Sequence, residues 1–421
     1  MKIRSIILLC LLLPLQVLKA QQPVSLNECQ EWAREAHPFL KQLEIYRQMS
    51  SLKLENIQTA WLPQIDLNAQ ASYQSAVTHI GISLPGVDIP TVSKDQYKAY
   101  LDVKQNIWDG GITKARQEME NVSSRVDLQA VEVNLYQVKE QVNSLFFSSF
   151  LIQQNLDLLA KKQETLEAQK QQMEGALNNG AILQSDLDQL LAELIKVKQQ
   201  QLELSSSLET TLSALAILTG KETASLLNLK IETSELEATA EIIRPEMELF
   251  HQQSELLAVS SELTRKARNP KLFGFGQAGY GRPALNMLND DFDTYYLVGV
   301  GLNWTLFDWK QTERSKEVIQ LQQQMVQTQQ VQFERTINIA LDSESRKIAR
   351  INSTLESDRE LIGLQERITQ SSASKLENGT ITAADYLQDL NAEMAARIIF
   401  ETHKVQLEAA KISYRNLLGQ E

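Results

Sequence analysis

The sequence is poor in cysteine and in long apolar runs, and each shortage excludes a class of structure. Only Cys10 and Cys29 occur in 421 residues. Cys10 lies in the leader described below, so the remaining chain has no intrachain disulfide and must be held together by packing. After Ala20 no run of about 18 apolar residues occurs, which excludes an ordinary transmembrane helix. If the chain crosses a membrane, it must do so as strands.

Basic residues are in the minority and histidines are few. The sequence has 41 Lys and Arg and 53 Asp and Glu, which gives a formal net charge of −12. We therefore expect no nucleic-acid partner. The four histidines have no ligand spacing, and we expect no metal and no cofactor: they are His37, His79, His251 and His403. No Ser-His-Asp or Cys-His grouping is spaced for catalysis, so we expect that the protein is not an enzyme.

The segment 1–20 has the pattern of a secretory signal peptide. Lys2 and Arg4 precede an apolar run over residues 6–13, and the small residue Ala20 closes a cleavage site. We therefore expect this segment to be removed and the mature chain to leave the cytoplasm. Leu9 precedes Cys10 where a lipoprotein signal has Gly or Ala, which argues against acylation of Cys10.

Internal repetition is what the sequence has in abundance. The spacing from Pro38 to Pro63 equals the spacing from Pro245 to Pro270, so an offset of 207 relates the two pairs. Further along, the offset is 199 at four pairs of markers: Asp109 and Asp308, Gly180 and Gly379, Asp186 and Asp385, and Gly220 and Gly419. This agreement predicts a duplication, with repeats at 21–220 and 244–421 and a linker at about 221–243.

Each repeat is predicted to begin with a medium helix and two strands. Ser25 and Glu28 are spaced as a capping box, Pro245 suits a first helical position, and Pro38 should interrupt the first of these helices. Alternating apolar and polar residues predict strands at about 64–74 and 96–108, and again at 271–281 and 295–307. The candidates for lipid-facing side chains on these strands are Leu101, Val103, Val298, Val300, Leu302, Trp304 and Leu306.

Each repeat then continues as a long helical hairpin, at 111–220 and 309–419. Residues 113–174 contain no Gly or Pro, and residues 311–378 contain only Gly363. At 1.5 Å per residue such helices reach roughly 90 to 100 Å, too long for a globular core. Asn179-Gly180 and Asn378-Gly379 should end them, because Gly accepts the left-handed conformation.

Amphipathic strands of about ten residues have the right length to cross a bilayer at a tilt. An open sheet edge in lipid leaves backbone groups unpaired, and closing a barrel takes about eight strands or more, so several copies must share one barrel. Two copies would give a filled barrel, whereas three would leave a lumen. The predicted fold class is therefore mainly α with a membrane β-barrel part: four strands per chain join a shared twelve-stranded barrel, which long coiled-coil helices continue as a tunnel.

This order of elements, duplicated, resembles that of the TolC-like outer-membrane factors, over nearly the whole mature chain. The local marks of the resemblance are Leu26 and Ala33 before His37-Pro38, Trp108-Asp109-Gly110-Gly111, Phe307-Asp308, and a Gly followed after five residues by Asp at both hairpin tips. The resemblance implies a homotrimer in the outer membrane of a Gram-negative cell, with a long periplasmic portion. It would be the passive exit duct of a tripartite efflux pump or a type I secretion system, with a periplasmic adaptor, an inner-membrane pump and outer-membrane lipid as partners.

The resemblance also assigns candidate residues to the hairpin tips. The adaptor would contact Asn179, Gly180, Asn378 and Gly379. A ring at the periplasmic entrance would comprise Asp186, Asp385 and Gln388, with Asp188 nearby. The sequence departs from the family pattern at Gln388, where a second acid is expected, and at Ile381, where an Arg that locks the entrance is expected.

Plainer interpretations stand beside these. Asp186 and Asp385 equally suit helix caps. Gly274, Gly276 and Gly279 spell GxGxxG, but Gly281 and Pro283 follow where a nucleotide site needs a helix, so small residues on a strand explain them better. A periplasmic coiled-coil adaptor would also have long hairpins but normally adds compact β-rich domains, for which this chain has no room. The transported cargo cannot be read from the sequence.

Overall fold

The computed structural model describes residues 23–78, 92–180, 182–231 and 241–420, which fall into two compact units. One unit holds the described residues up to His37 together with Gln137–Glu241 and Ala340–Glu421, and the other holds Pro38–Tyr136 and Ile242–Ile339. The predicted signal peptide, residues 1–20, and residues 232–240 of the predicted linker lie outside the described residues.

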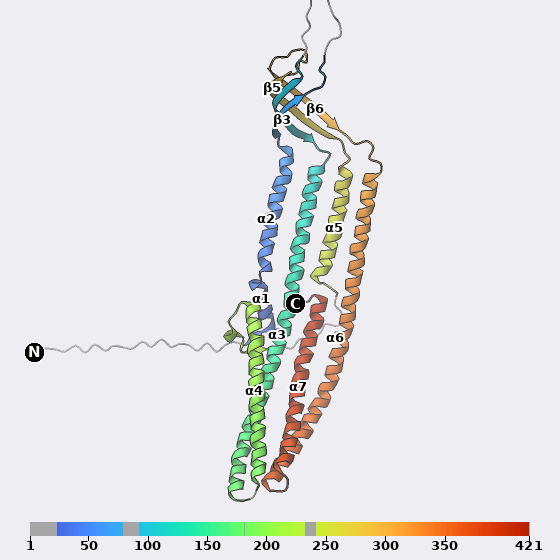
Figure 1. The fold of residues 1–421 in the computed structure, drawn as a ribbon. Helices are drawn as coiled ribbons and strands as arrows, with labels where there is room; N and C mark the ends of the chain where they lie inside the picture. Colours follow the sequence, from blue (N-terminus) through green and yellow to red (C-terminus); the bar gives the residue numbers. More distant parts are fainter. Residues whose placement is uncertain (1–22, 79–91, 181, 232–240, 421) are drawn as a thin grey trace, which may run out of the picture. The chain divides into compact units, whose positions relative to one another are not determined.

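The chain is mostly helical, and its long helices come in pairs of equal length (Figure 1). Helices α3 (Ile112–Asn178) and α6 (Gln311–Glu377) have 67 residues each. Their return helices α4 (Gln184–Thr219) and α7 (Ala383–Leu418) have 36 each. The bounds of α3 and α6, and those of α4 and α7, are related by the same offset of 199 that the sequence markers give. In the described part of the chain, none of the helices has an apolar stretch long enough to span a bilayer.

The shorter helices begin and end where local chemistry predicts. Helix α1 (Leu26–Ala36) starts with the predicted capping box, in which the Ser25 hydroxyl accepts from the Glu28 N–H at 3.3 Å and the Glu28 carboxylate accepts from the Ser25 N–H at 2.8 Å. It stops at His37, and α2 (Phe39–Gln58) follows Pro38, which confirms the predicted interruption. Helix α5 (Pro245–Lys266) starts at Pro245, as predicted.

The segment predicted as a linker is structured at its start. The 3₁₀ turn η2 (Thr223–Leu226) leads into strand β4 (Leu229–Lys230), which pairs in parallel with β1 (Val24–Ser25). Leu226 is fully buried in a cluster with Cys29 and Phe146, and burial raises the pKa of the Cys29 thiol to about 12. Residues 223–230 of the predicted linker are therefore ordered, because removing these leucines from water stabilises the segment against α1.

Four antiparallel strands form the sheet of the second unit. They are β2 (Gln64–Tyr73), β3 (Asp95–Trp108), β5 (Lys271–Arg282) and β6 (Asp293–Asn303), in the order β2-β3-β5-β6. The 3₁₀ turn η1 (Thr59–Trp61) leads from α2 to β2. Among the described residues, β2 and β6 each pair with one neighbour only. The outer edges of both strands therefore keep backbone groups available for further pairing.

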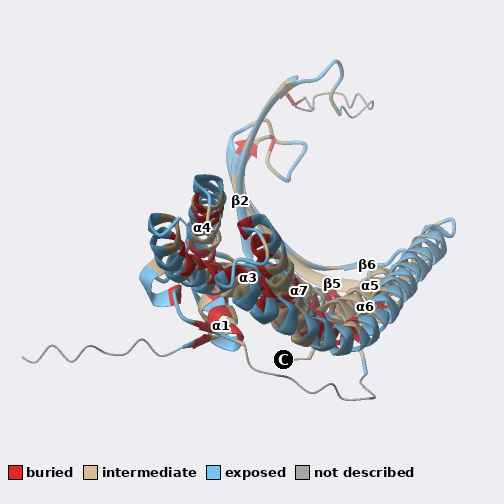
Figure 2. Cartoon of the chain, turned by 90° about the horizontal axis from the view of Figure 1, so that it is seen from below, coloured by how far each residue is buried: buried red, intermediate tan, exposed pale blue. Residues whose placement is uncertain are grey.

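The register of the sheet assigns most lipid-facing candidates to one face. Val103 pairs with Ile65 and with Gly276, and Gly276 pairs with Val298. Directly paired residues point to the same side of an antiparallel sheet, and residues two apart along a strand share that side. We call this side the apolar face; the candidates on it are Leu101, Val103, Val298, Val300 and Leu302. In the single chain, coloured by burial in Figure 2, Leu101, Val298, Val300 and Leu302 are exposed, with Val298 76 % exposed, and Val103 is half-buried.

Strand β6 is shorter than predicted. It ends at Asn303, whose partner Lys271 is the first residue of β5. Pro270 comes before Lys271 and has no N–H with which to continue the ladder. The prediction that Trp304 and Leu306 lie in the strand was therefore wrong, although both side chains are exposed just beyond its end.

The glycine motif lies inside strand β5. Gly274, Gly276 and Gly279 all fall within Lys271–Arg282, and β6 is the next element after this strand. The GxGxxG spelling therefore belongs to a strand, as the plainer interpretation holds, and not to a loop that opens a helix.

Candidate functional site

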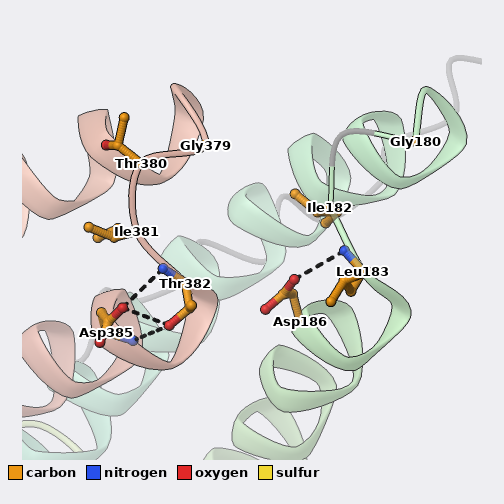
Figure 3. Close-up of a pocket in the computed structure, with 9 residues that line it drawn as sticks. All are labelled: Gly180, Ile182, Leu183, Asp186, Gly379, Thr380, Ile381, Thr382 and Asp385. Atoms are coloured by element: carbon orange, nitrogen blue, oxygen red, sulfur yellow. Dashed lines mark hydrogen bonds between the residues drawn. The ribbon is translucent and has the colours of Figure 1, made fainter.

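The tips of the two helical hairpins lie in the same unit and line one shared pocket of about 430 Å³ (Figure 3). Its lining residues come from the α3–α4 and α6–α7 connections: Gly180, Ile182, Leu183, Asp186, Gly379, Thr380, Ile381, Thr382 and Asp385. Each lining residue from Gly180 to Asp186 has a counterpart in the second tip at the offset of 199. The pocket is thus built from two copies of the same turn.

A glycine in the left-handed conformation ends the long helix at each tip. Gly180 has φ +68° and Gly379 has φ +66°. At the second tip, the Gly379 N–H donates to the Leu376 carbonyl at 3.0 Å and the Thr380 N–H donates to the Lys375 carbonyl at 2.9 Å, which closes α6. Added side chains at either glycine would meet nothing within 4 Å, so backbone conformation and not crowding requires glycine here.

Asp385 caps helix α7. Its carboxylate accepts from the Thr382 N–H at 3.0 Å and from the Thr382 hydroxyl at 2.7 Å, while the Thr382 hydroxyl accepts from the Asp385 N–H at 3.3 Å. The hydrogen bonds from the Thr382 side chain and backbone hold the pKa of Asp385 below its usual range. This carboxylate is therefore charged at neutral pH and is tied to its own loop (Figure 3).

Asp186 makes a weaker version of the same cap on α4. It accepts one hydrogen bond, from the Leu183 N–H at 3.1 Å. Leucine stands where the second tip has Thr382, so no hydroxyl donates to this carboxylate. The helix-cap interpretation is thus confirmed for both aspartates. Because both also line the pocket, the entrance ring stays a prediction for them.

The remaining predicted tip residues do not all line the pocket. Asn179 and Asn378 are exposed beside the two glycines. Gln388 is exposed one turn further along α7 and is not part of the pocket wall. Ile381 does line the pocket, in the place where the family pattern has an arginine. Among the described residues, no three His, Cys, Asp or Glu side chains come together as a metal site.

Sequence reasoning missed a buried polar contact that joins the two hairpins. The Lys162 ammonium on α3 donates to Glu193 on α4 at 2.7 Å and to Asn391 on α7 at 2.6 Å. Lys162 is 7 % exposed and Glu193 is 8 % exposed. Burial alone would raise the pKa of Glu193, but the hydrogen bond and charge of Lys162 outweigh it and lower this pKa. A signal was available, because Lys162 falls on the stripe of Leu159 and Leu166.

This contact lies within the apolar core of the hairpins. Leu166, Leu190 and Val197 are fully buried there. The same cluster includes Leu376, Tyr386, Leu387, Leu390 and Met394 from the second hairpin. The two hairpins therefore pack together through a continuous core, and Lys162 is a cation within it.

Two aspartates hold equivalent turns where the sheet joins the long helices. Asp109 accepts from the Thr113 N–H at 2.6 Å, and Asp308 accepts from the Thr312 N–H at 3.0 Å. In the first turn Gly110 and Gly111 have positive φ. Their counterparts at the offset of 199, Trp309 and Lys310, adopt the same left-handed conformation with φ +52° and +62°, which is strained for residues with a side chain.

Four of the five tryptophans lie at these junctions between helix and strand. Trp61 ends η1, Trp108 ends β3, and two more follow β6. All four side chains are exposed: Trp61, Trp108, Trp304 and Trp309. Exposed indoles at the ends of strands are typical of the boundary between a membrane and water.

Comparison with known proteins gives a family match over part of the chain. Residues 31–221, which span the first sheet hairpin and the first helical hairpin, match the family model described as outer membrane efflux protein. Over these residues the chain resembles the outer membrane efflux proteins. This match supports the resemblance to outer-membrane factors noted in the sequence. Comparison with curated protein sequences gives no match.

Solved structures extend the similarity to nearly the whole chain. The CmeC outer membrane channel of Campylobacter jejuni is 17 % identical with a TM-score of 0.66, and the match covers 94 % of this chain and 85 % of CmeC. The outer membrane protein VceC of Vibrio cholerae is 12 % identical with a TM-score of 0.69, covering 94 % and 96 %. CusC is 13 % identical with a TM-score of 0.71, covering 94 % and 92 %. The chain therefore shares their fold over nearly its whole length.

Proposed function

We propose that three copies of this chain form, in the outer membrane, the passive exit duct of a tripartite efflux pump or a type I secretion system. The observation that carries the proposal is the four-stranded sheet with two open edges and one exposed apolar face. In lipid those edges must be paired. Three copies supply twelve strands, enough to close a barrel around a lumen, whereas two would give a barrel filled by side chains.

The apolar face and the tryptophans support the same orientation. In the proposed barrel Leu101, Val103, Val298, Val300 and Leu302 face lipid, and the exposed indoles lie at its periplasmic boundary. Helices α3 and α6 then continue the barrel as a tunnel, since 67 residues extend about 100 Å.

The hairpin tips are the proposed periplasmic entrance. Asn179, Gly180, Asn378 and Gly379 are exposed there and would contact a periplasmic adaptor, which connects the duct to an inner-membrane pump that supplies the energy. Three copies of the pocket would arrange Asp186, Asp385 and Gln388 around the opening. Carboxylates at a narrow opening attract cations and repel one another.

The test uses the full-length purified protein. We expect chemical cross-linking to yield a trimer, a high-salt wash to leave the protein in the outer-membrane fraction, and planar bilayers to show discrete conducting channels. A periplasmic adaptor without a lipid anchor would be released by salt. A protein that inserts correctly as a monomer would contradict the duct. Strand hairpins that remain accessible to water would contradict it as well.

The entrance ring has its own test in the same bilayers. We expect Asp385→Ala and Asp385→Asn to raise single-channel conductance and to weaken block by Ca²⁺ about tenfold, the effect of losing about 1.4 kcal/mol of Coulomb attraction. The matched control is Thr382→Ala, which removes a hydroxyl partner of the cap but keeps the charge. If Thr382→Ala changes the block as much as Asp385→Asn does, the carboxylate acts as a helix cap and not as a ring.

A further inference from the structure

The sheet face opposite the apolar face is mostly polar, and its apolar side chains are Phe273, Phe275 and Leu297. We call it the lumenal face, because it lines the lumen if the proposed duct is correct. The register places on it, among others, Asp66, Asp102, Lys104, Gln277, Phe273 and Phe275. Apolar side chains on an otherwise polar face are the informative departure from strand alternation. The two phenylalanines therefore need a separate explanation.

Each phenylalanine ring lies over a glycine of the neighbouring strand. Phe273 pairs with Gly301 and Phe275 pairs with Gly299. A Cβ atom on Gly301 would lie 2.4 Å from the Phe273 ring, and one on Gly299 would lie 2.5 Å from the Phe275 ring. The ring centroids are 6.2 Å apart at an interplanar angle of 45°. Because these glycines have no side chain, both rings can lie flat against the neighbouring strand. The rings then offer an aromatic face without projecting far from the sheet.

The first repeat carries acids at the equivalent place. The offset of 207 relates Phe273 to Asp66, and the offset of 199 relates Gly301 to Asp102. Asp66 and Asp102 pair directly across β2 and β3, just as Phe273 and Gly301 pair across β5 and β6. Directly opposed like charges destabilise a sheet. The carboxylate pair of the first repeat therefore occupies the place that Phe273 and Gly301 occupy in the second, while Phe275 corresponds to Asn68. Three copies would alternate the carboxylates and the rings around the lumen.

A cation already sits on one of these rings. The Lys104 ammonium lies 4.7 Å from the centroid of Phe273. Lys104 is directly opposite Phe275, and two positions along β3 is Asp102, which accepts from Gln277 at 2.9 Å. Aromatic faces attract cations at such distances. The two carboxylates also outnumber this lysine on their part of the face.

We infer that Asp66, Asp102, Phe273 and Phe275 form a contact site for aromatic organic cations that pass through the duct. The carboxylates attract the positive charge, and the flat rings contact the aromatic part of the same molecule. The site rests on the proposed function, because only a closed duct makes this face a lumen. The simpler alternative is that the rings only cover glycines and stabilise the hairpin, and the test separates the two.

The experiment measures current block in planar bilayers that contain the purified full-length protein. The probes are tetraphenylphosphonium and tetrabutylammonium, which carry the same charge with and without aromatic rings. We expect tetraphenylphosphonium to block at about fivefold lower concentration, the size of one exposed cation–π contact. In the double variant Phe273→Leu, Phe275→Leu, the two ions should block equally.

Further variants assign the parts of the site. Asp66→Asn with Asp102→Asn should weaken block by both ions to the same extent, and Lys104→Gln should strengthen block by tetraphenylphosphonium. The matched control Val298→Leu changes the apolar face and should leave both ions unaffected. The single variant Phe275→Leu serves if the double variant fails to form trimers.

The outcomes are separable. Equal block of the unchanged protein by the two ions would overturn the contact site, as would a Leu variant that keeps the preference for tetraphenylphosphonium. In both cases the channel still conducts, so the duct would stand. Absence of any conductance in the unchanged protein would overturn the duct and the contact site together.

Discussion

Replacing Lys162 by alanine is expected to cost about 3–5 kcal/mol of stability and to loosen the contact between the two hairpins. The substitution removes the buried cation of Glu193, leaving only the more exposed Lys196 ammonium at 3.5 Å, and it leaves Asn391 without its donor. Both losses fall in the core that joins the hairpins. Chemical denaturation of the purified protein should show a lower midpoint, and hydrogen exchange should show faster opening of α4 and α7.

The control for this prediction removes both charges. In Lys162→Met with Glu193→Leu no buried charge is left unpaired, so most of the stability should return. A single variant as stable as the original would show that the contact contributes nothing.

Acid should weaken the same contact in the original protein. The folded-state pKa of Glu193 lies below its ordinary value of 4.5. Its contribution to stability is therefore fully present above that value, and it is lost as the pH falls through the lowered pKa. The double variant should lack this acid-dependent loss.

Replacing Gly110 by valine is expected to destabilise the junction between sheet and helices by about 2–5 kcal/mol, the sum of a backbone cost and a steric cost. Gly110 has φ +71°, which costs a residue with a side chain roughly 1–2 kcal/mol. A Cβ atom there would also lie 2.5 Å from the Asn269 Cβ atom and 3.1 Å from the Pro270 carbonyl oxygen, an overlap that adds about 1–3 kcal/mol. The yield of trimer after membrane extraction should fall sharply.

Gly175 provides a control of opposite sign. It lies inside α3, and an added Cβ atom would meet nothing within 4 Å. Gly175→Ala should therefore stabilise the helix by about 1 kcal/mol. If Gly110→Val is tolerated as well as Gly175→Ala, the close approach of Gly110 to Asn269 and Pro270 does not affect the stability of the protein.

The sequence predicts the long elements well because their signals are local. Helix caps such as Ser25 and the break at Pro38 depend on neighbours a few positions away. The matching pairs of glycines and aspartates do not require knowledge of contacts, and the bounds of α3, α4, α6 and α7 repeat their offset of 199. The charged residues at the hairpin tips, Asp186 and Asp385, can also be identified from the sequence alone.

What the sequence does not predict depends on partners far along the chain. The end of β6 is set by Lys271 and Pro270 on another strand, and no pattern around Trp304 shows it. The role of the phenylalanines needs the register that pairs Phe273 with Gly301. The contact of Lys162 with Asn391 joins residues of different hairpins, 229 positions apart. Such contacts become visible only when the elements are packed.

The contrast between Gly110 and Trp309 has a consequence for the symmetry of the duct. Inside one chain, Gly110 fits tightly against Asn269 and Pro270. The offsets of 199 and 207 place Trp309 against residues 62 and 63 of the next copy in a trimer. An indole cannot occupy the space of a hydrogen atom, so in the proposed trimer the joint between chains must differ from the joint within a chain. The helices of equal length would then approach sixfold symmetry, whereas the collar where they meet the membrane would be strictly threefold.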